Sequence, residues 1–263
     1  MNKMNFSVAL TRSVAGVAGF AIWLAAWQWL TTAGPLSGIS GVPTMTAAVG
    51  ESYRLLGDPK FWQAIGETLV MALSGLAIAL VVGVVLGVVT AIWKPANEAL
   101  DPLVQFLRPI PAVVTLPLVL LIFGPTRDLG IFLAAYGAIW PILVQVQVGV
   151  RDVDPVAIDT ARAMSLPWMR VQTAVVLPSA APYIMTGVRI AATAALMLSI
   201  AAGLLGGSPG LGRRILIAQE AAQSDLAFGL ILWSGLIGIL FAFAVNIVER
   251  IILRGRRPLE EMA

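Results

Sequence analysis

The chain has 263 residues, of which 59% are hydrophobic and only 12% are charged, and its mean hydropathy is +0.89. A soluble domain usually carries about 25% charged residues, so these charges are too few to cover a surface in contact with water. The absence of Cys and His excludes disulfides, thiolate chemistry and the commonest metal ligand, and the net charge of +3 does not indicate nucleic-acid binding. The composition predicts a protein covered mostly by lipid.

Six segments of the chain approach or exceed the roughly 20 apolar residues that a helix needs to cross a bilayer. Their apolar runs are continuous instead of alternating, which disfavours a β-barrel. The sequence therefore predicts an all-α polytopic membrane protein, a single domain over residues 1–263, with about six transmembrane helices: Val14–Thr31, Thr68–Ile92, Leu103–Phe123, Leu129–Val148, Ala181–Leu205 and Leu226–Leu253.

The first of these segments resembles a signal peptide in length. It has no A-x-A cleavage site, however, and Trp27 and Trp29 resemble interfacial anchors, so we predict a helix that is retained. Gly34–Pro43, which is rich in Gly, Pro and Ser, indicates a loop, and a surface helix is expected over Thr44–Leu56.

The distribution of Lys and Arg predicts the orientation. With six spans both termini lie on one side, and that side holds about twice as many Lys and Arg as the other. The positive-inside rule then places both termini in the cytoplasm, together with the polar segment Arg151–Pro178.

This polar segment contains a predicted short helix outside the membrane. Pro155 can begin a helix, because its missing N–H lies among the unbonded donors of the first turn, and Pro167 disfavours helical geometry at Leu166. Asp159 and Arg162 are spaced i, i+3, as in a local ion pair worth a few tenths of a kcal/mol. From spacing alone, a solvated connector and a docking surface remain equal alternatives.

The same segment resembles the EAA loop of bacterial ATP-binding-cassette (ABC) importer permeases, in which E-A-A is followed by three residues, G, nine residues and I-x-L-P. Asp159, Thr160 and Ala161 occupy the E-A-A positions, Ser165 that of the glycine, and residues 175–178 (VVLP) the end of the pattern. Asp replaces Glu and Ser replaces Gly.

Two further segments are similar to nitrate/sulfonate/taurine-type permeases. One is residues 107–111 (LRPIP), followed by Leu116-Pro117 and Phe123-Gly124 in the third span; the other is residues 207–212 (GSPGLG), which resembles an extracytoplasmic S-x-G-L-G element. The resemblance covers about Thr68 to the C-terminus.

The resemblance implies a type I ABC importer permease fold with a core over residues 68–253 and a cytoplasmic coupling loop over residues 151–178. It implies a bacterial inner-membrane protein that works with a second permease copy or paralogue, two ABC ATPase subunits, an extracytoplasmic solute-binding protein and membrane lipid. The solute would be a small organic or inorganic molecule of the sulfonate, nitrate or taurine type, and the resemblance favours an anion. The expected coupling residues are Asp159, Thr160, Ala161, Arg162, Ser165, Leu166 and Pro167, with Asp159 as the helix-capping carboxylate near the positive end of the dipole.

ATP binding is not expected on this chain. The segment closest to a P-loop, residues 207–214 (GSPGLGRR), lacks the lysine and hydroxyl that hold phosphates and Mg²⁺. ATP and Mg are therefore expected on the partner ATPase subunits, with no cofactor, metal or catalytic residue on this non-catalytic chain.

Arg108 and Arg189 fall inside apolar spans, and intramembrane charge suggests function. Both lie near the predicted cytoplasmic ends, so structural anchoring by snorkelling remains an alternative to a place in the pathway. By family resemblance the third and fifth helices line the pathway or gate, and the polar or adaptable candidates are Gln105, Arg108, Thr115, Arg189, Thr193, Met197 and Ser199. For each of them helix–helix packing is the alternative.

Three other functions are alternatives for this sequence. An ATP-independent channel or secondary transporter would favour acidic residues near span centres, whereas Asp and Glu lie mostly outside them. A membrane enzyme would need a catalytic constellation, and no pairing of Ser, Asp and Lys is recognisable. A passive scaffold is separated from a transporter only by the EAA-like loop.

Overall fold

The structure is a computed structural model that describes residues 16, 18–19, 21–37, 39 and 41–253. The described chain is helical, which confirms the all-α prediction. Its elements are α2 (Met45–Leu55), α3 (Pro59–Ile92), α4 (Lys94–Leu107), the 3₁₀ turn η1 (Ala112–Thr115), α5 (Leu116–Phe123), α6 (Arg127–Arg151), α7 (Pro155–Ala163), α8 (Trp168–Val171), the π-helical η2 (Gln172–Val176), α9 (Leu177–Gly206), α10 (Leu211–Glu220) and α11 (Ser224–Leu253).

Within the described residues, four helical segments are long and apolar enough to cross a membrane, or five if the bent pair α4 with η1–α5 counts as one span. The first predicted span, Val14–Thr31, begins outside the described residues, and residues 21–32 are helical. The second begins earlier than predicted, because Pro59 occupies the first turn of α3 and the Asp58 carboxylate caps it by accepting from the Lys60 N–H at 2.9 Å.

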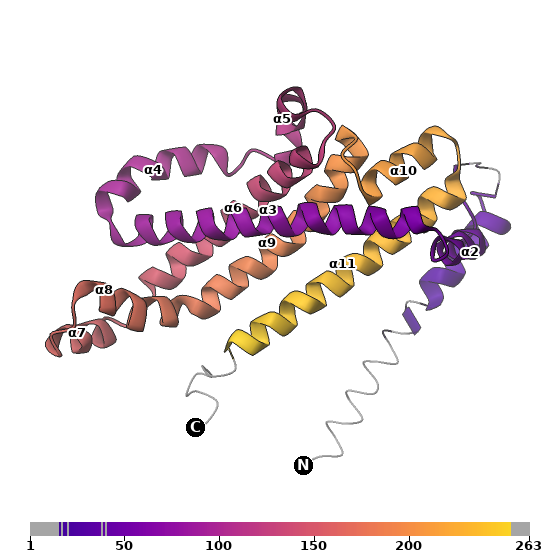
Figure 1. Cartoon of the computed structure of the whole chain (residues 1–263). Helices are drawn as coiled ribbons and strands as arrows, with labels where there is room; N and C mark the ends of the chain where they lie inside the picture. Colours follow the sequence, from indigo (N-terminus) through magenta and orange to yellow (C-terminus); the bar gives the residue numbers. More distant parts are fainter. Residues whose placement is uncertain (1–15, 17, 20, 38, 40, 254–263) are drawn as a thin grey trace, which may run out of the picture.

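The third predicted span, Leu103–Phe123, which prolines interrupt in the sequence, is sharply bent. Its two helical halves meet at an angle of 84°. The break lies at Pro109 and Pro111, which lack the N–H that a helix interior requires and push the preceding residues away from helical geometry. As Figure 1 shows, α4 turns back along the outside of the bundle, and α5 projects from it.

The centre of the bundle is formed by α3, α6 and α9, which pack along one another (Figure 1). Glycines allow this close approach: a Cβ atom added to Gly75 of α3 would lie 2.5 Å from the Cβ of Ala134 in α6. Gly83 and Gly87 contact Ile142 and Val146 of α6 in the same way. Small residues let membrane helices pack closely where lipid provides no hydrophobic driving force.

The short helix α10 crosses α9 with a glycine on each side. A Cβ atom on Gly212 would lie 1.9 Å from the carbonyl oxygen of Ile200, and one on Gly203 would lie 2.8 Å from the backbone nitrogen of Arg213. The buried Thr68 hydroxyl of α3 accepts from the Leu211 N–H at 2.9 Å and so caps α10. These contacts fix α10 against both long helices.

The bundle has two differently built ends (Figure 1). The segment α7–α8 lies at one end, which we call the α7 end, whereas α2 and α10 lie at the other, the α10 end. The long helices α3, α6 and α9 connect the two ends. A surface helix was predicted at Thr44–Leu56, and α2 occupies this position with Thr44 as its cap.

Candidate functional site

The helix α7 begins at Pro155, as the sequence predicts, but a different carboxylate caps it. The side chain of Asp154 accepts from the Val156 N–H at 2.8 Å. Asp159 is the fifth residue of the helix, so its predicted role as the capping carboxylate is wrong. Proline favours the first position of a helix, so the residue directly before it is the N-cap. Asp154 occupies this position, and Asp is among the residues preferred there.

The other end of α7 is closed by a left-handed residue, Ser165, with φ of 58°. The Ser165 N–H donates to the Arg162 carbonyl at 2.8 Å, and the Leu166 N–H donates to the Ala161 carbonyl at 3.2 Å. Paired bonds of this kind close a helix when the residue after the cap is left-handed, a conformation that glycine adopts most easily. The structure therefore gives a reason for the glycine of the EAA pattern and shows that serine takes its place with the same backbone geometry.

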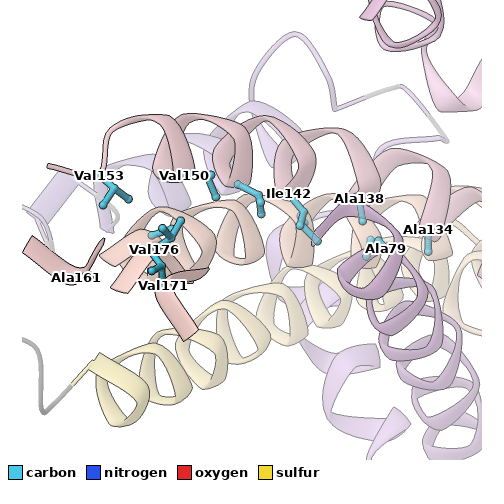
Figure 2. Packing of buried hydrophobic residues seen from close by; sticks show 13 residues of the cluster. Ala79, Ala134, Ala138, Ile142, Val150, Val153, Ala161, Val171 and Val176 are labelled. Atoms are coloured by element: carbon cyan, nitrogen blue, oxygen red, sulfur yellow. The ribbon is translucent and has the colours of Figure 1, made fainter. Parts of the chain in front are cut away.

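One face of α7 packs onto the bundle. Ala161 is 5% exposed and belongs to a cluster with Val153, Val171 and Val176, against which Ile158 and Leu166 pack. Figure 2 shows Val153, Ala161, Val171 and Val176 gathered where α7 and α8 meet the ends of α6 and α9. Ala161 and Leu166 therefore hold α7 in place.

The α7 end also exposes large apolar side chains. Val156 is 69% exposed, Met164 71% and Trp168 60%. Asp159 and Arg162 lie beside them, also exposed, with 3.5 Å between their charged atoms. We call Val156, Met164, Trp168 and Met169 the α7 apolar patch. It was not predicted from the sequence, although apolar residues within a polar loop are a signal for such a patch.

Polar contacts connect this end to the long helices. The Arg151 guanidinium donates to Asn97 of α4 at 2.8 Å, and Gln147 of α6 donates to Thr90 of α3 at 2.7 Å. The Tyr183 hydroxyl of α9 bonds the Asp152 carboxylate, at the start of the loop that precedes α7. These bonds would therefore transmit a movement of α7 to α6 and α9.

The residues predicted for the pathway fall into three places. Arg189, Thr193 and Met197 lie on one exposed face of α9 at intervals of four residues. Ser199 lies on the opposite, packed side: it is 1% exposed, and its hydroxyl donates to the Ala195 carbonyl at 2.8 Å. The structure therefore separates Ser199 from the other candidates on this helix.

The remaining candidates lie on the bent segment. Gln105 is exposed on α4 and donates to Asp101 at 2.7 Å, and the Thr115 hydroxyl in η1 donates to the Ala112 carbonyl at 2.7 Å. Arg108, the C-cap of α4, is exposed, and no ion-pair partner is found for it among the described residues. The break therefore places the Arg108 guanidinium, which has no ion-pair partner among the described residues, at the end of α4.

Arg189 has an ion-pair partner that was not predicted from the sequence. Its Nε donates to the Glu249 carboxylate of α11 at 2.9 Å, and a terminal nitrogen of the guanidinium bonds the same oxygen. Glu249 is only 13% exposed. The position of Glu249 inside the last apolar span indicates such a pair in the sequence, because an intramembrane charge is expected to have a partner of opposite charge. This ion pair supports the anchoring interpretation for Arg189.

Removing one member of this pair should destabilise the protein more than removing both. We expect Arg189→Met to lower the free energy of unfolding by about 2 kcal/mol, because it leaves Glu249 poorly hydrated and unpaired. Arg189→Met combined with Glu249→Leu should recover most of the loss. Thermal unfolding in detergent measures both, and a double variant no more stable than the single one would contradict the expectation.

Comparison with known proteins identifies the family. The family described as "Binding-protein-dependent transport system inner membrane component" matches residues 79–258. The nitrate import permease protein NrtB of Leptolyngbya laminosa is 30% identical, with 91% of this chain and 87% of the relative covered. The bicarbonate transport system permease protein CmpB of Synechococcus elongatus is 33% identical over 92% of this chain and 88% of the relative. The chain belongs to this family of inner-membrane transport components.

Solved structures show the same fold. An inward-facing structure of the MetNI methionine ABC transporter matches with a TM-score of 0.63 at 21% identity, over 74% of this chain and 98% of that one. The predicted importer-permease fold is thereby confirmed. The chain is a multi-pass permease component of an ABC importer, and ATP hydrolysis belongs to a partner ATPase.

Proposed function

We propose that this chain forms the translocation pathway for a small oxoanion of the nitrate, bicarbonate or sulfonate type. The named relatives support this class, since they include nitrate and bicarbonate permeases and, at 28% identity over 91% of this chain and 87% of the relative, a putative aliphatic sulfonates transport permease protein SsuC of Bacillus subtilis. Arg108, with no carboxylate partner among the described residues, supports it from the chain itself, because an unpaired cation favours an anion.

The observation that carries the proposal is α7. It is a short, doubly capped helix held on one face by Ala161 and Leu166, and it also exposes apolar side chains. An exposed apolar patch beside a charged pair is typical of a protein interface. In our proposal the α7 end faces the cytoplasm, and the coupling loop, residues 151–178, is seated in a groove of an ATPase subunit.

The coupling residues divide into two roles under this proposal. Asp159, Thr160 and Arg162 are exposed beside the α7 apolar patch and contact the ATPase. Ala161, Ser165, Leu166 and Pro167 fix the helix and its end, and so transmit its movement to α9. None of these residues has a chemical role.

We further propose that the exposed face of α9 and the bent segment face the pathway shared with a second permease subunit. Arg189, Thr193 and Met197 lie on that face, and Gln105, Arg108 and Thr115 lie along the bend. The complete importer would then hold two permease subunits, two ATPase subunits and an external solute-binding protein.

Reconstitution tests the proposed function. We expect the chain, purified with the ATPase of its transport system and placed in proteoliposomes, to take up labelled nitrate, bicarbonate or an aliphatic sulfonate. Uptake should require both ATP and the binding protein. Uptake that proceeds without ATP would instead establish a channel or secondary transporter, and failure of an ATPase to co-purify would remove the coupling role.

A further inference from the structure

A cavity of about 350 Å³ lies where α3, α5 and α6 meet. Ile78 of α3 and Phe123 of α5 line two of its sides, and one stripe of α6 lines the rest: Asp128, Ile131, Phe132, Ala135, Tyr136 and Ile139. The lining is apolar except for the Asp128 carboxylate and the Tyr136 hydroxyl, which already donates to the Leu107 carbonyl at 2.9 Å. We call it the α6 cavity.

The α6 cavity extends along one half of a membrane span. Asp128 lies in the first turn of α6, which has 25 residues, and Ile139 lies near its middle. At about 1.5 Å per residue, these two positions are about 16 Å apart along the helix axis. The hydrocarbon core of a bilayer is about 30 Å thick, so the cavity is about as long as one leaflet is deep.

The α6 cavity is also narrow. Its volume of about 350 Å³ over a length of about 16 Å gives a mean cross-section of roughly 20 Å². A helix with its side chains is about 10 Å across, so a helix of a second subunit is too wide for the cavity, whereas an extended hydrocarbon chain is not. Ile78 is 46% exposed and Phe132 39%, so such a chain can enter sideways from the bilayer.

Asp128 places a negative charge at the α10 end of the cavity. Its side chain is exposed and makes no ion pair or hydrogen bond among the described residues. The helix dipole favours an acid in the first turn of α6, but this does not require the acid to line an apolar cavity. The negative charge repels anions, so the proposed oxoanion does not fit as the occupant.

Arg127, the preceding residue, places a positive charge beside Asp128. Its Nε lies 2.7 Å from one Glu67 oxygen of α3, and a terminal nitrogen donates to the other oxygen at 2.7 Å. These contacts use one edge of the guanidinium, and the side chain remains 53% exposed. Its second terminal nitrogen can therefore donate to an anionic group. Two opposite charges thus lie at one end of an apolar cavity.

We propose that the α6 cavity binds a phospholipid with a primary ammonium headgroup, such as phosphatidylethanolamine. One acyl chain fills the cavity, the ammonium donates to Asp128, and the phosphate accepts from Arg127. A zwitterionic headgroup complements the two opposite charges, and charge-assisted hydrogen bonds are about twice as strong as neutral ones. The proposal does not depend on which solute the importer carries.

Native mass spectrometry of the purified full-length chain tests this site. The chain is titrated with dioleoylphosphatidylethanolamine or with dioleoylphosphatidylcholine, which has the same acyl chains but no N–H in its headgroup. We expect the wild type to bind the ethanolamine lipid about tenfold more tightly, which is the effect of about one hydrogen bond to a charged group. Asp128→Asn should bind both lipids with the affinity that the wild type has for the choline lipid.

Ile78→Trp tests the cavity itself. Ile78 is partly exposed, so a larger side chain at this position can extend into the cavity without displacing buried residues. The acyl chain then loses its place, and we expect the affinity for both lipids to fall about tenfold or more.

Each variant has a matched control. Ile247→Trp introduces the same side chain at a 43% exposed position of α11 outside the cavity. Asp225→Asn removes an acid from the first turn of α11, so it reproduces the effect of Asp128→Asn on a helix dipole without changing the cavity. Neither control should change the affinity for either lipid.

Four results would overturn the proposal. Equal affinity of the wild type for the two lipids would show that no side chain recognises the ammonium. Loss of the preference in Asp225→Asn as well would assign it to charge in general. Unchanged lipid binding by Ile78→Trp would place the lipid elsewhere on the chain. If Ile78→Trp instead lost permease dimers in the same spectra, with lipid binding unchanged, the cavity would belong to the contact between two permease copies.

Discussion

Replacing Met164 by aspartate should detach the ATPase from the permease and abolish ATP-dependent transport. Met164 is 71% exposed and forms part of the α7 apolar patch, so a charge there does not disturb the packed face formed by Ala161 and Leu166. An apolar anchor at an interface contributes about 2 kcal/mol or more to the free energy of binding. Its loss therefore corresponds to a roughly 30-fold weaker complex. Co-purification of the ATPase with the permease measures this loss.

The control for Met164→Asp is Tyr53→Asp, which introduces the same charge at a 78% exposed side chain of α2, at the opposite end of the bundle. We expect it to keep the ATPase bound. Both variants should reach the membrane in wild-type amounts. Normal association of the ATPase with the Met164 variant would show that the α7 apolar patch is not the coupling surface.

Replacing Gly212 by alanine should prevent stable folding. The added Cβ atom would lie 1.9 Å from the Ile200 carbonyl oxygen and 2.6 Å from the Leu204 nitrogen, both of them backbone atoms of α9. No rotation of a side chain relieves such an overlap, so α10 must move away from α9. Overpacking typically lowers the free energy of unfolding by about 1–3 kcal/mol. Because this overlap is with backbone atoms, we expect a loss of about 3 kcal/mol or more.

Fluorescence-detected size-exclusion chromatography and thermal unfolding would report the loss. Gly238→Ala is the matched control, because a Cβ atom at Gly238 in α11 meets nothing within 4 Å. Alanine is a better helix former than glycine by about 1 kcal/mol, so this variant should be unchanged or slightly more stable. Equal stability of the two alanine variants would contradict the close crossing of α9 and α10.

The presence and approximate extent of the main helices could be predicted because local chemistry determines them, although α3 begins at Pro59 and not at Thr68. Apolar runs long enough to cross a membrane indicated α3, α6, α9 and α11, and Pro155 and Pro167 enclosed α7. The break in the third span was visible as Pro109 and Pro111, but its angle was not, because it depends on how α4 and α5 pack against other helices.

The site was less predictable because it depends on partners distant in sequence. Arg108 and Arg189 looked alike in their apolar spans, and only the fold shows that Glu249, 60 residues away, pairs with Arg189. The opposite faces that Met197 and Ser199 occupy on α9 likewise follow from which neighbours cover the helix. Asp154 was predictable in principle, since a capping carboxylate directly before a helix proline is a local pattern.

The π-helical η2 between α8 and α9 determines the direction, around the helix axis, in which the α7 end points. Each residue of an α-helix advances about 100° around the axis, and the i→i+5 bonds of a π segment accommodate one residue more than an α-helix would. Trp168 and the rest of α8 are therefore rotated by about 100° from where a continuous α-helix through Gln172–Val176 would place them. Losing a single residue in this segment would turn the α7 apolar patch toward a different direction while leaving its composition intact.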